Sequence, residues 1–233
     1  MKYILLLLLI FGISCATQNE KIVWDYLRQE GLTEAGAAGL MGNLQAESNI
    51  QSVIYENIYK DQLGFTDQEY VNKVNDGSYT NFVNDQVGFG LAQWTYFTRK
   101  QALLDMCRGD IGNLNCQLKY LMHEFQTDFS GILATLKTST DVRACALKVM
   151  IEFENPVDQS EAKKNFRAQL AQNYYNEFTG SGPAGNTYTV AAGDTLYAIA
   201  IKFSTTVEVL CELNHNDKPN LNLCRSSLKY NLK

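Results

Sequence analysis

The chain has 233 residues, 45% hydrophobic and 19% charged, with 20 Lys and Arg against 25 Asp and Glu and a net charge of −5. This composition is typical of a globular protein and excludes an intrinsically disordered chain. The sequence contains no stripe of basic residues, which excludes a nucleic-acid-binding surface. The length suits one medium-sized domain together with a small one.

The first 16 residues have the pattern of a secretory signal peptide. A short basic start precedes an apolar run over residues 3–13, and the segment ends in small residues at Ala16. We predict cleavage after Ala16 and a secreted protein, because the run is too short for a membrane span. The alternative is a lipoprotein acylated at Cys15, which Gly12 disfavours because such signals usually carry Leu there. No segment after residue 16 has the 18 consecutive apolar residues that a membrane-spanning helix needs. We therefore expect no contact with the membrane after cleavage of the signal peptide.

Apolar residues at helical spacing recur up to residue 178, which predicts a mainly α domain. Thr66 followed by Glu69 is a capping-box signature at the start of one helix. The stretch VNDQVGFGLAQWT, residues 83–95, differs because Gly88 and Gly90 flank a Phe before an apolar run. It predicts a tight turn or a small β-hairpin region among the helices. The expected helices cover residues 20–30, 33–46, 67–75, 95–108, 114–127, 140–154 and 160–177.

A glycine-rich polar segment, TGSGPAGN at residues 179–186, is typical of a linker. It separates a long part, residues 17–178, from a short part, residues 187–233. The long part holds 14 Lys and Arg against 21 Asp and Glu, a charge of −7, whereas the short part holds 5 against 4, a charge of +1. The short part follows a strand–helix–helix–strand pattern, which predicts a small α+β domain.

The cysteines and histidines indicate disulfides rather than a metal site. Five cysteines remain after the signal peptide, so in an oxidising compartment some should pair and at least one stays free or pairs between molecules. Cys107 and Cys116, or either of them with Cys145, would link helices, and Cys211 and Cys224 could pair in the short part. With no C-x-x-C and only two distant histidines, we expect no metal and no cofactor.

The stretch GLMGNLQAESNI, residues 39–50, carries an acid where an apolar face is expected. The helix over 33–46 contains three glycines spaced by three, which indicates a face that another backbone approaches closely. Glu47 follows at the carboxyl end, where the helix dipole and apolar surroundings both disfavour its charged form. A protonated carboxyl is what glycoside hydrolysis requires of its general acid. The simpler interpretation is a partly exposed acid at a frayed helix end.

A resemblance favours the catalytic interpretation. AES at the end of a glycine-rich helix, followed some 40 residues later by GFGLAQWT, resembles the goose-type lysozyme and lytic transglycosylase superfamily. With FENPVDQSEA further along, the order of motifs is closer to the lysozyme-like domains of phage tail lysins. The resemblance covers most of residues 20–178 and implies a mainly α lysozyme-like domain with a small β-hairpin region.

The resemblance also implies residue roles. Glu47 matches the catalytic acid and Ser48 the serine that hydrogen-bonds near it. A tyrosine of the last helix closes such sites against the glutamate, and either Tyr174 or Tyr175 could match. On physical grounds Trp94 could stack on a sugar ring. The implied substrate-binding turn consists of Gly90, Leu91 and Gln93.

The second carboxylate is less clearly indicated. Asp85 stands three residues before Gly88, one closer than in the goose-type pattern, and Thr95 occupies a position where that pattern has Asp. We expect Asp85 to serve as the base that positions water in a hydrolytic reaction. The alternative is that Glu47 acts alone, as in lytic transglycosylases, with the substrate's N-acetyl group assisting.

The short part resembles a LysM domain over nearly its whole length, from YTVAAGDTLYAIA to LCELNHNDKPNLNL. The resemblance implies a βααβ fold that binds N-acetylglucosamine-containing glycans in peptidoglycan or chitin. The implied binding groove lies between two loops, whose residues include Gly193, Asp194, Thr195 and Asn220.

Taken together, these features predict a secreted monomeric muramidase, targeted by LysM, that cleaves the β-1,4 bond between N-acetylmuramic acid and N-acetylglucosamine. Its only expected partner is bacterial peptidoglycan, met outside the cell or in a phagosomal or lysosomal compartment. The alternatives are a lytic transglycosylase, a chitinase-like enzyme and a catalytically inactive protein that binds peptidoglycan or chitin.

Overall fold

The computed structural model describes residues 17–181. The predicted signal peptide, most of the linker and the LysM-like part lie outside these residues. Within them the chain is helical and contains no strand, and none of its helices is long and apolar enough to cross a membrane. The elements are α1 (Gln18–Gln29), α2 (Glu34–Ser48), η1 (Asn57–Tyr59), α3 (Lys60–Leu63), α4 (Asp67–Asn75), α5 (Phe97–Met106), α6 (Leu114–Thr127), α7 (Ser130–Thr138), α8 (Val142–Val149), the π-helical turn η2 (Met150–Glu154) and α9 (Glu161–Thr179).

The predicted mainly α architecture is confirmed, and each of the seven expected helices is present within a few residues of its expected bounds. The capping box at Thr66 and Glu69 forms as predicted at the start of α4. Two short helical segments were not expected: residues 57–63 and α7. Helix α7 has nine residues and no side-chain hydrogen bond at its N-cap, Phe129, so it lacks the usual start signal.

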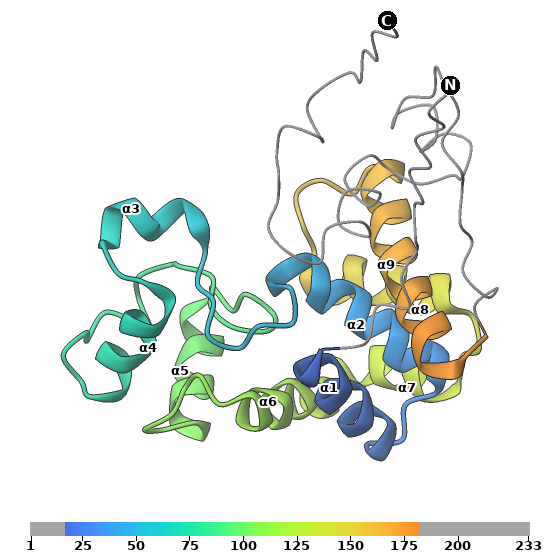
Figure 1. Cartoon of the computed structure of the whole chain (residues 1–233), viewed down its shortest axis with the longest axis horizontal. Helices are drawn as coiled ribbons and strands as arrows, with labels where there is room; N and C mark the ends of the chain where they lie inside the picture. Colours follow the sequence, from blue (N-terminus) through green and yellow to red (C-terminus); the bar gives the residue numbers. More distant parts are fainter. Residues whose placement is uncertain (1–16, 182–233) are drawn as a thin grey trace, which may run out of the picture.

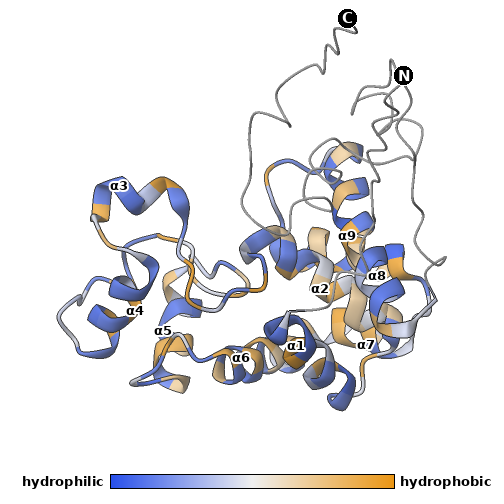
Figure 2. Cartoon of the chain, viewed as in Figure 1, coloured by the Kyte–Doolittle hydropathy of each residue, from blue (hydrophilic) through white to orange (hydrophobic). Residues whose placement is uncertain are grey.

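Helix α2 is the centre of the domain. It packs most extensively against α9 and α8, and also against α7 and α1. Figure 1 shows α1, α2, α7, α8 and α9 gathered on one side, α3 and α4 on the other, and α6 running between them. The inner part of α2 is pale to orange in Figure 2, whereas α3 and α4 are mostly blue. Every residue from Ala35 to Leu44 is buried, so α2 fixes the position of the residues at its carboxyl end.

The three glycines of α2 each meet a different neighbour, as the predicted close approach requires. A Cβ on Gly36 would lie 1.9 Å from the Leu136 carbonyl oxygen of α7. On Gly39 it would lie 2.5 Å from Cys145 Cβ of α8, and on Gly42 2.5 Å from the Ala171 nitrogen of α9. The glycines therefore let three helices pack directly on the backbone of α2.

Replacing Gly39 by Ala is expected to destabilise the protein by about 2 kcal/mol, because the added methyl overpacks the α2–α8 contact by more than the gain in helix propensity. The matched control is Gly131→Ala in α7, where a Cβ meets nothing within 4 Å. That variant should be stabilised by up to about 1 kcal/mol. Urea unfolding of both variants measures the difference, and equal effects would contradict the packing role.

The tight turn predicted within residues 83–95 is confirmed. Phe89 and Trp94 form an isolated antiparallel bridge, with N–O distances of 3.2 and 2.9 Å in the two directions. The Gln93 amide donates to the Gly90 carbonyl oxygen at 3.1 Å, which closes the turn. A second isolated bridge joins Tyr55 to Phe89. The expected β-hairpin region thus consists of isolated bridges in the described residues, without strands.

One disulfide joins the end of α5 to the start of α6. Cys107 and Cys116 are bonded, with a Cα–Cα distance of 5.8 Å, and Cys145 is a free buried thiol. This is one of the pairings left open by the sequence. The other expected pair, Cys211 with Cys224, lies outside the described residues.

Candidate functional site

Glu47 is the last acid of α2 and lies one residue before the end of the helix. Its side chain is 21% exposed and forms an ion pair with Arg167 of α9. The same guanidinium donates at 3.0 Å to the side-chain oxygen of Asn43, which is fully buried one turn earlier. The surroundings expected for Glu47 were apolar, whereas the structure places the guanidinium of Arg167 in direct contact with its carboxyl group.

Ser48 links the two motifs that the resemblance singled out. Its hydroxyl is buried and lies 3.0 Å from the Leu44 carbonyl oxygen and 2.9 Å from that of Leu91. The second contact spans 43 residues and fixes the end of α2 against the turn that contains Gly90. The structure thus brings Glu47 and this turn to the same place, with Ser48 buried in a positioning role.

The residues of the turn divide into structural and accessible groups. Gly90 has φ +71°, and a Cβ there would lie 2.5 Å from the Gln117 side-chain oxygen. Leu91 is fully buried, and its amide donates to that same oxygen at 3.0 Å. Gln93 is half-buried with φ +44°, and its side-chain amide donates to the Gly90 carbonyl at 3.0 Å. Gln93 is therefore the member of the turn best placed to meet a ligand.

Trp94 does not offer a face for a sugar, contrary to the expectation from the sequence. It is fully buried, its ring packs against Tyr120 at 5.2 Å, and its indole nitrogen donates to Glu124 at 2.8 Å. Glu124 in turn binds Arg99 of α5 through two parallel hydrogen bonds. The tryptophan thus belongs to the support of the site.

Glu154 is a second carboxylate, whose charge interacts with that of Glu47, and no role for it was predicted from the sequence. It ends the π-turn η2 and is half-buried, and its Oε1 is shielded from solvent without a hydrogen-bond partner. Burial, with the negative charge of Glu47 second, raises the pKa of the Glu154 carboxyl well above its ordinary value. Its signal in the sequence was the acid of FENP, at the end of an apolar helical run.

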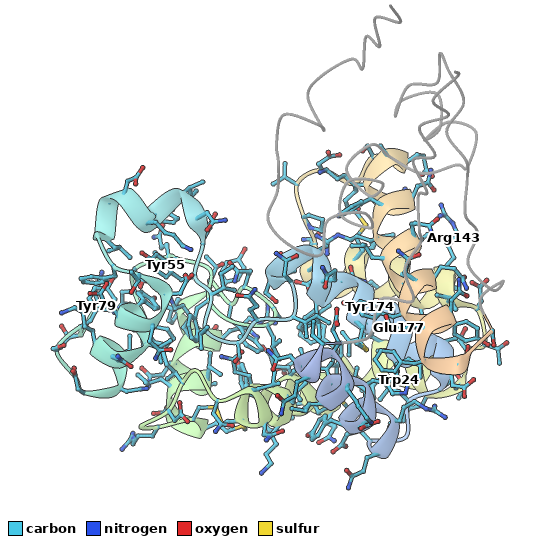
Figure 3. The ribbon with its side chains drawn as sticks, in the orientation of Figure 1. Trp24, Tyr55, Tyr79, Arg143, Tyr174 and Glu177 are labelled. Carbon is cyan, nitrogen blue, oxygen red and sulfur yellow. A yellow bond between two sulfur atoms is a disulfide. The ribbon has the colours of Figure 1, made fainter. Side chains whose placement is uncertain are left out.

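Asp85 is placed in a different environment from the one expected of a water-positioning base. It is 3% exposed and forms an ion pair with Lys100, which is fully buried. It also accepts from the hydroxyls of Tyr70 at 2.6 Å and Tyr79 at 3.1 Å, and from the Val87 amide at 3.0 Å. Figure 3 places Tyr79 on the α3–α4 side of the molecule and Tyr174 on the α9 side. These contacts support a structural role for Asp85, and none of them involves Glu47.

The two candidate tyrosines of α9 point in different directions. The Tyr174 hydroxyl is 2.7 Å from Glu20 Oε1 and 2.6 Å from Gln45 Oε1, so it joins α9 to α1 and α2. Tyr175 lines a separate hollow with Arg28, Thr33 and neighbouring residues.

Within residues 17–181 no group of three His, Cys, Asp or Glu could hold a metal ion. The predicted glycan-binding residues Gly193, Asp194, Thr195 and Asn220 lie outside the described residues.

This helical domain, with an acid at the end of a buried helix and a glycine turn fixed beside it, has the features of a lysozyme-like glycosidase or transglycosylase. The chain belongs to the phage tail lysozyme family, which it matches over residues 18–178, and it matches the LysM domain family over residues 188–223. It is similar to Morphogenesis protein 1 of Bacillus phage B103, with 23% identity over 176 residues. That match covers 72% of this chain and 41% of the phage protein, so the chain spans less than half of that relative.

Proposed function

We propose that the protein is a secreted muramidase that degrades bacterial peptidoglycan by cleaving the β-1,4 bond between N-acetylmuramic acid and N-acetylglucosamine. The observation that carries this proposal is the Ser48–Leu91 hydrogen bond, which holds the Glu47 end of α2 against the Gly90–Gln93 turn. Glu47 is the general acid, and Gln93 contacts the glycan. Arg167 binds the Glu47 carboxyl, and the same guanidinium donates to the side-chain oxygen of Asn43, which fixes its position.

The proposed organisation assigns residues 1–16 to a signal peptide, 17–178 to the catalytic domain, 179–186 to a linker and 187–233 to a LysM domain. The LysM domain binds the glycan chains of the wall and raises the concentration of the enzyme there. This matters because the catalytic part carries 14 basic against 21 acidic residues and is repelled by an anionic envelope.

A second candidate, lytic transglycosylase activity, is favoured by the environment of Asp85. Lys100, two tyrosine hydroxyls and a backbone amide surround this carboxylate, which leaves it poorly placed to activate water. Without a base, Glu47 would act with the N-acetyl group of the substrate and form an anhydro-sugar.

The mass of the products from purified peptidoglycan separates these activities. Hydrolysis leaves a reducing muramic acid end, whereas transglycosylation gives a product lighter by one water. Chitin oligomers, offered beside peptidoglycan, identify a chitinase-like preference. Binding to walls without any product from either substrate would overturn the proposal and indicate a catalytically inactive glycan-binding protein.

A further inference from the structure

Glu56 is held against the glycine turn by its backbone and by its side chain. Its amide donates to the Gly88 carbonyl oxygen at 2.9 Å, and the Gly88 amide donates to Glu56 Oε2 at 3.3 Å. The Tyr59 amide donates to the Glu56 carbonyl oxygen at 3.1 Å. The preceding residue, Tyr55, forms the isolated bridge to Phe89. These contacts fix the place of the Glu56 carboxylate at the start of the turn.

The side chain of Gln93 lies against the same glycine. A Cβ on Gly88 would lie 3.0 Å from Gln93 Oε1 and 3.3 Å from Gln93 Cβ, so glycine leaves room for this side chain. The Gln93 amide also donates to the carbonyl oxygen of Ile54, two residues before Glu56, at 3.5 Å. Both Gln93 and Glu56 are half-buried. The carboxylate of Glu56 is therefore next to the member of the turn that is best placed to meet a ligand.

Glu47 is attached to the same turn from a different segment. The hydroxyl of its neighbour Ser48 lies 2.9 Å from the Leu91 carbonyl oxygen, three residues after Gly88. Two acids thus meet one short turn, Glu47 from the end of α2 and Glu56 from the segment that leads to η1.

The ion pairs of the domain single out Glu56. Three carboxylates contact the glycine turn or the residues that flank it: Asp85, Glu124 and Glu56. Asp85 pairs with Lys100, and Glu124 pairs with Arg99. In the part of the chain that the structure describes, Glu56 forms no ion pair, and its side chain accepts a single hydrogen bond. A carboxylate has about four acceptor positions, so most of those of Glu56 are open to water or a ligand.

We propose that Glu56 is the second carboxylate of the site and the base that takes a proton from the attacking water. This inference rests on the proposed function, with Glu47 as the general acid. It supplies the group that the surroundings of Asp85 withhold, and it makes the reaction an inverting hydrolysis.

The atoms and protons of this reaction balance. The bond between the anomeric carbon of N-acetylmuramic acid and the leaving oxygen breaks, and its electron pair stays on that oxygen, which takes the proton of Glu47. The water oxygen bonds to the anomeric carbon from the opposite face and gives one proton to Glu56. Exchange with solvent then returns a proton to Glu47 and removes one from Glu56.

The first test is Glu56→Gln in the full chain. The amide oxygen of Gln can still accept from the Gly88 amide, but Gln cannot take a proton from water. The rate at which reducing ends form from purified peptidoglycan should fall by about a hundredfold or more. The control is Asp61→Asn, an exposed carboxylate five residues later, which should keep the wild-type rate. A Glu56→Gln variant that keeps more than about a tenth of that rate would overturn the proposal.

The second test, chemical rescue by azide, separates a base from a structural residue. Azide is an anionic nucleophile that needs no base, and Glu56→Ala leaves space for it. The azide nitrogen should bond to the anomeric carbon as Glu47 protonates the leaving oxygen, which gives an α-glycosyl azide and raises the rate of the variant by about tenfold or more. A variant with the wild-type circular dichroism spectrum that is inactive and gains nothing from azide would overturn the proposal.

The wild-type products distinguish failure of this inference from failure of the proposed function. NMR of the earliest products should show a reducing N-acetylmuramic acid in the α configuration. A reducing end that first forms in the β configuration would leave the muramidase intact and overturn Glu56 as the base. An anhydro product, which needs no base, or the absence of any cleavage would reject the proposed hydrolysis itself.

Discussion

Replacing Glu47 by Gln is expected to lower the rate of peptidoglycan cleavage by about a hundredfold or more. Transfer of a proton to a leaving group by a positioned acid accounts for roughly 10² to 10⁴ in rate. The amide of Gln fills the same space and can still contact Arg167, but it has no proton of suitable acidity to give. The measurement is the initial rate at which soluble fragments are released from purified peptidoglycan between pH 5 and 8, which detects both hydrolysis and transglycosylation.

Glu34 provides the matched control for this substitution. It is an exposed carboxylate at the opposite end of the same helix, so Glu34→Gln changes the same charge on α2 far from the turn at Gly90. This variant should keep wild-type activity. If Glu47→Gln retained more than about a tenth of the wild-type rate while folded, Glu47 would not be the general acid.

Replacing Asp85 by Asn is expected to cost about 3–5 kcal/mol of unfolding free energy, because it leaves the Lys100 ammonium buried without its anion. Burial already lowers the pKa of Lys100, so the charged form depends on this partner. The double variant Asp85→Asn with Lys100→Met removes both charges and should recover part of the loss. Urea unfolding of the single and double variants measures both effects.

The same substitution distinguishes a structural Asp85 from a catalytic one. Asp25→Asn, which breaks an exposed pair with Lys21, should change stability by less than about 1 kcal/mol and serves as the control. Conditions that keep Asp85→Asn folded should preserve most of its activity per folded molecule. A variant of normal stability with no activity would restore Asp85 as the water-positioning base.

The helices and the centre of the domain could be predicted because their signals are local. The capping box at Thr66 needs only four residues, and the spacing of Gly36, Gly39 and Gly42 is visible within one helix. That Glu47 and the turn belong to one site was implied by the resemblance to the goose-type lysozyme superfamily, which the order of the motifs carries. The structure adds the hydrogen bond from Ser48 that holds them together.

Three features could not be predicted because they depend on contacts across long stretches of sequence. Arg167 reaches Glu47 from 120 residues away, and its charge changes the surroundings of the acid. Asp85 lies near the turn in sequence, but the structure pairs it with the buried Lys100 on α5. Tryptophan is a residue type that can stack on a sugar ring, yet Trp94 packs against α6 and is completely buried. Neither the type of a residue nor its spacing in the sequence shows whether its side chain lies in the interior or at the surface of the folded domain.

The widened turn at Met150–Glu154 has a consequence for comparing relatives of this protein. A π-turn holds one residue more than an α-turn, so deleting a residue here would rotate the end of the helix by roughly 100° and move the Glu154 side chain out of its enclosed position. Related chains should therefore either keep the length of this segment together with its final acid or lose both. A single-residue gap just before the FENP motif should therefore identify, from the sequence alone, related chains that lack an enclosed carboxyl group at this place.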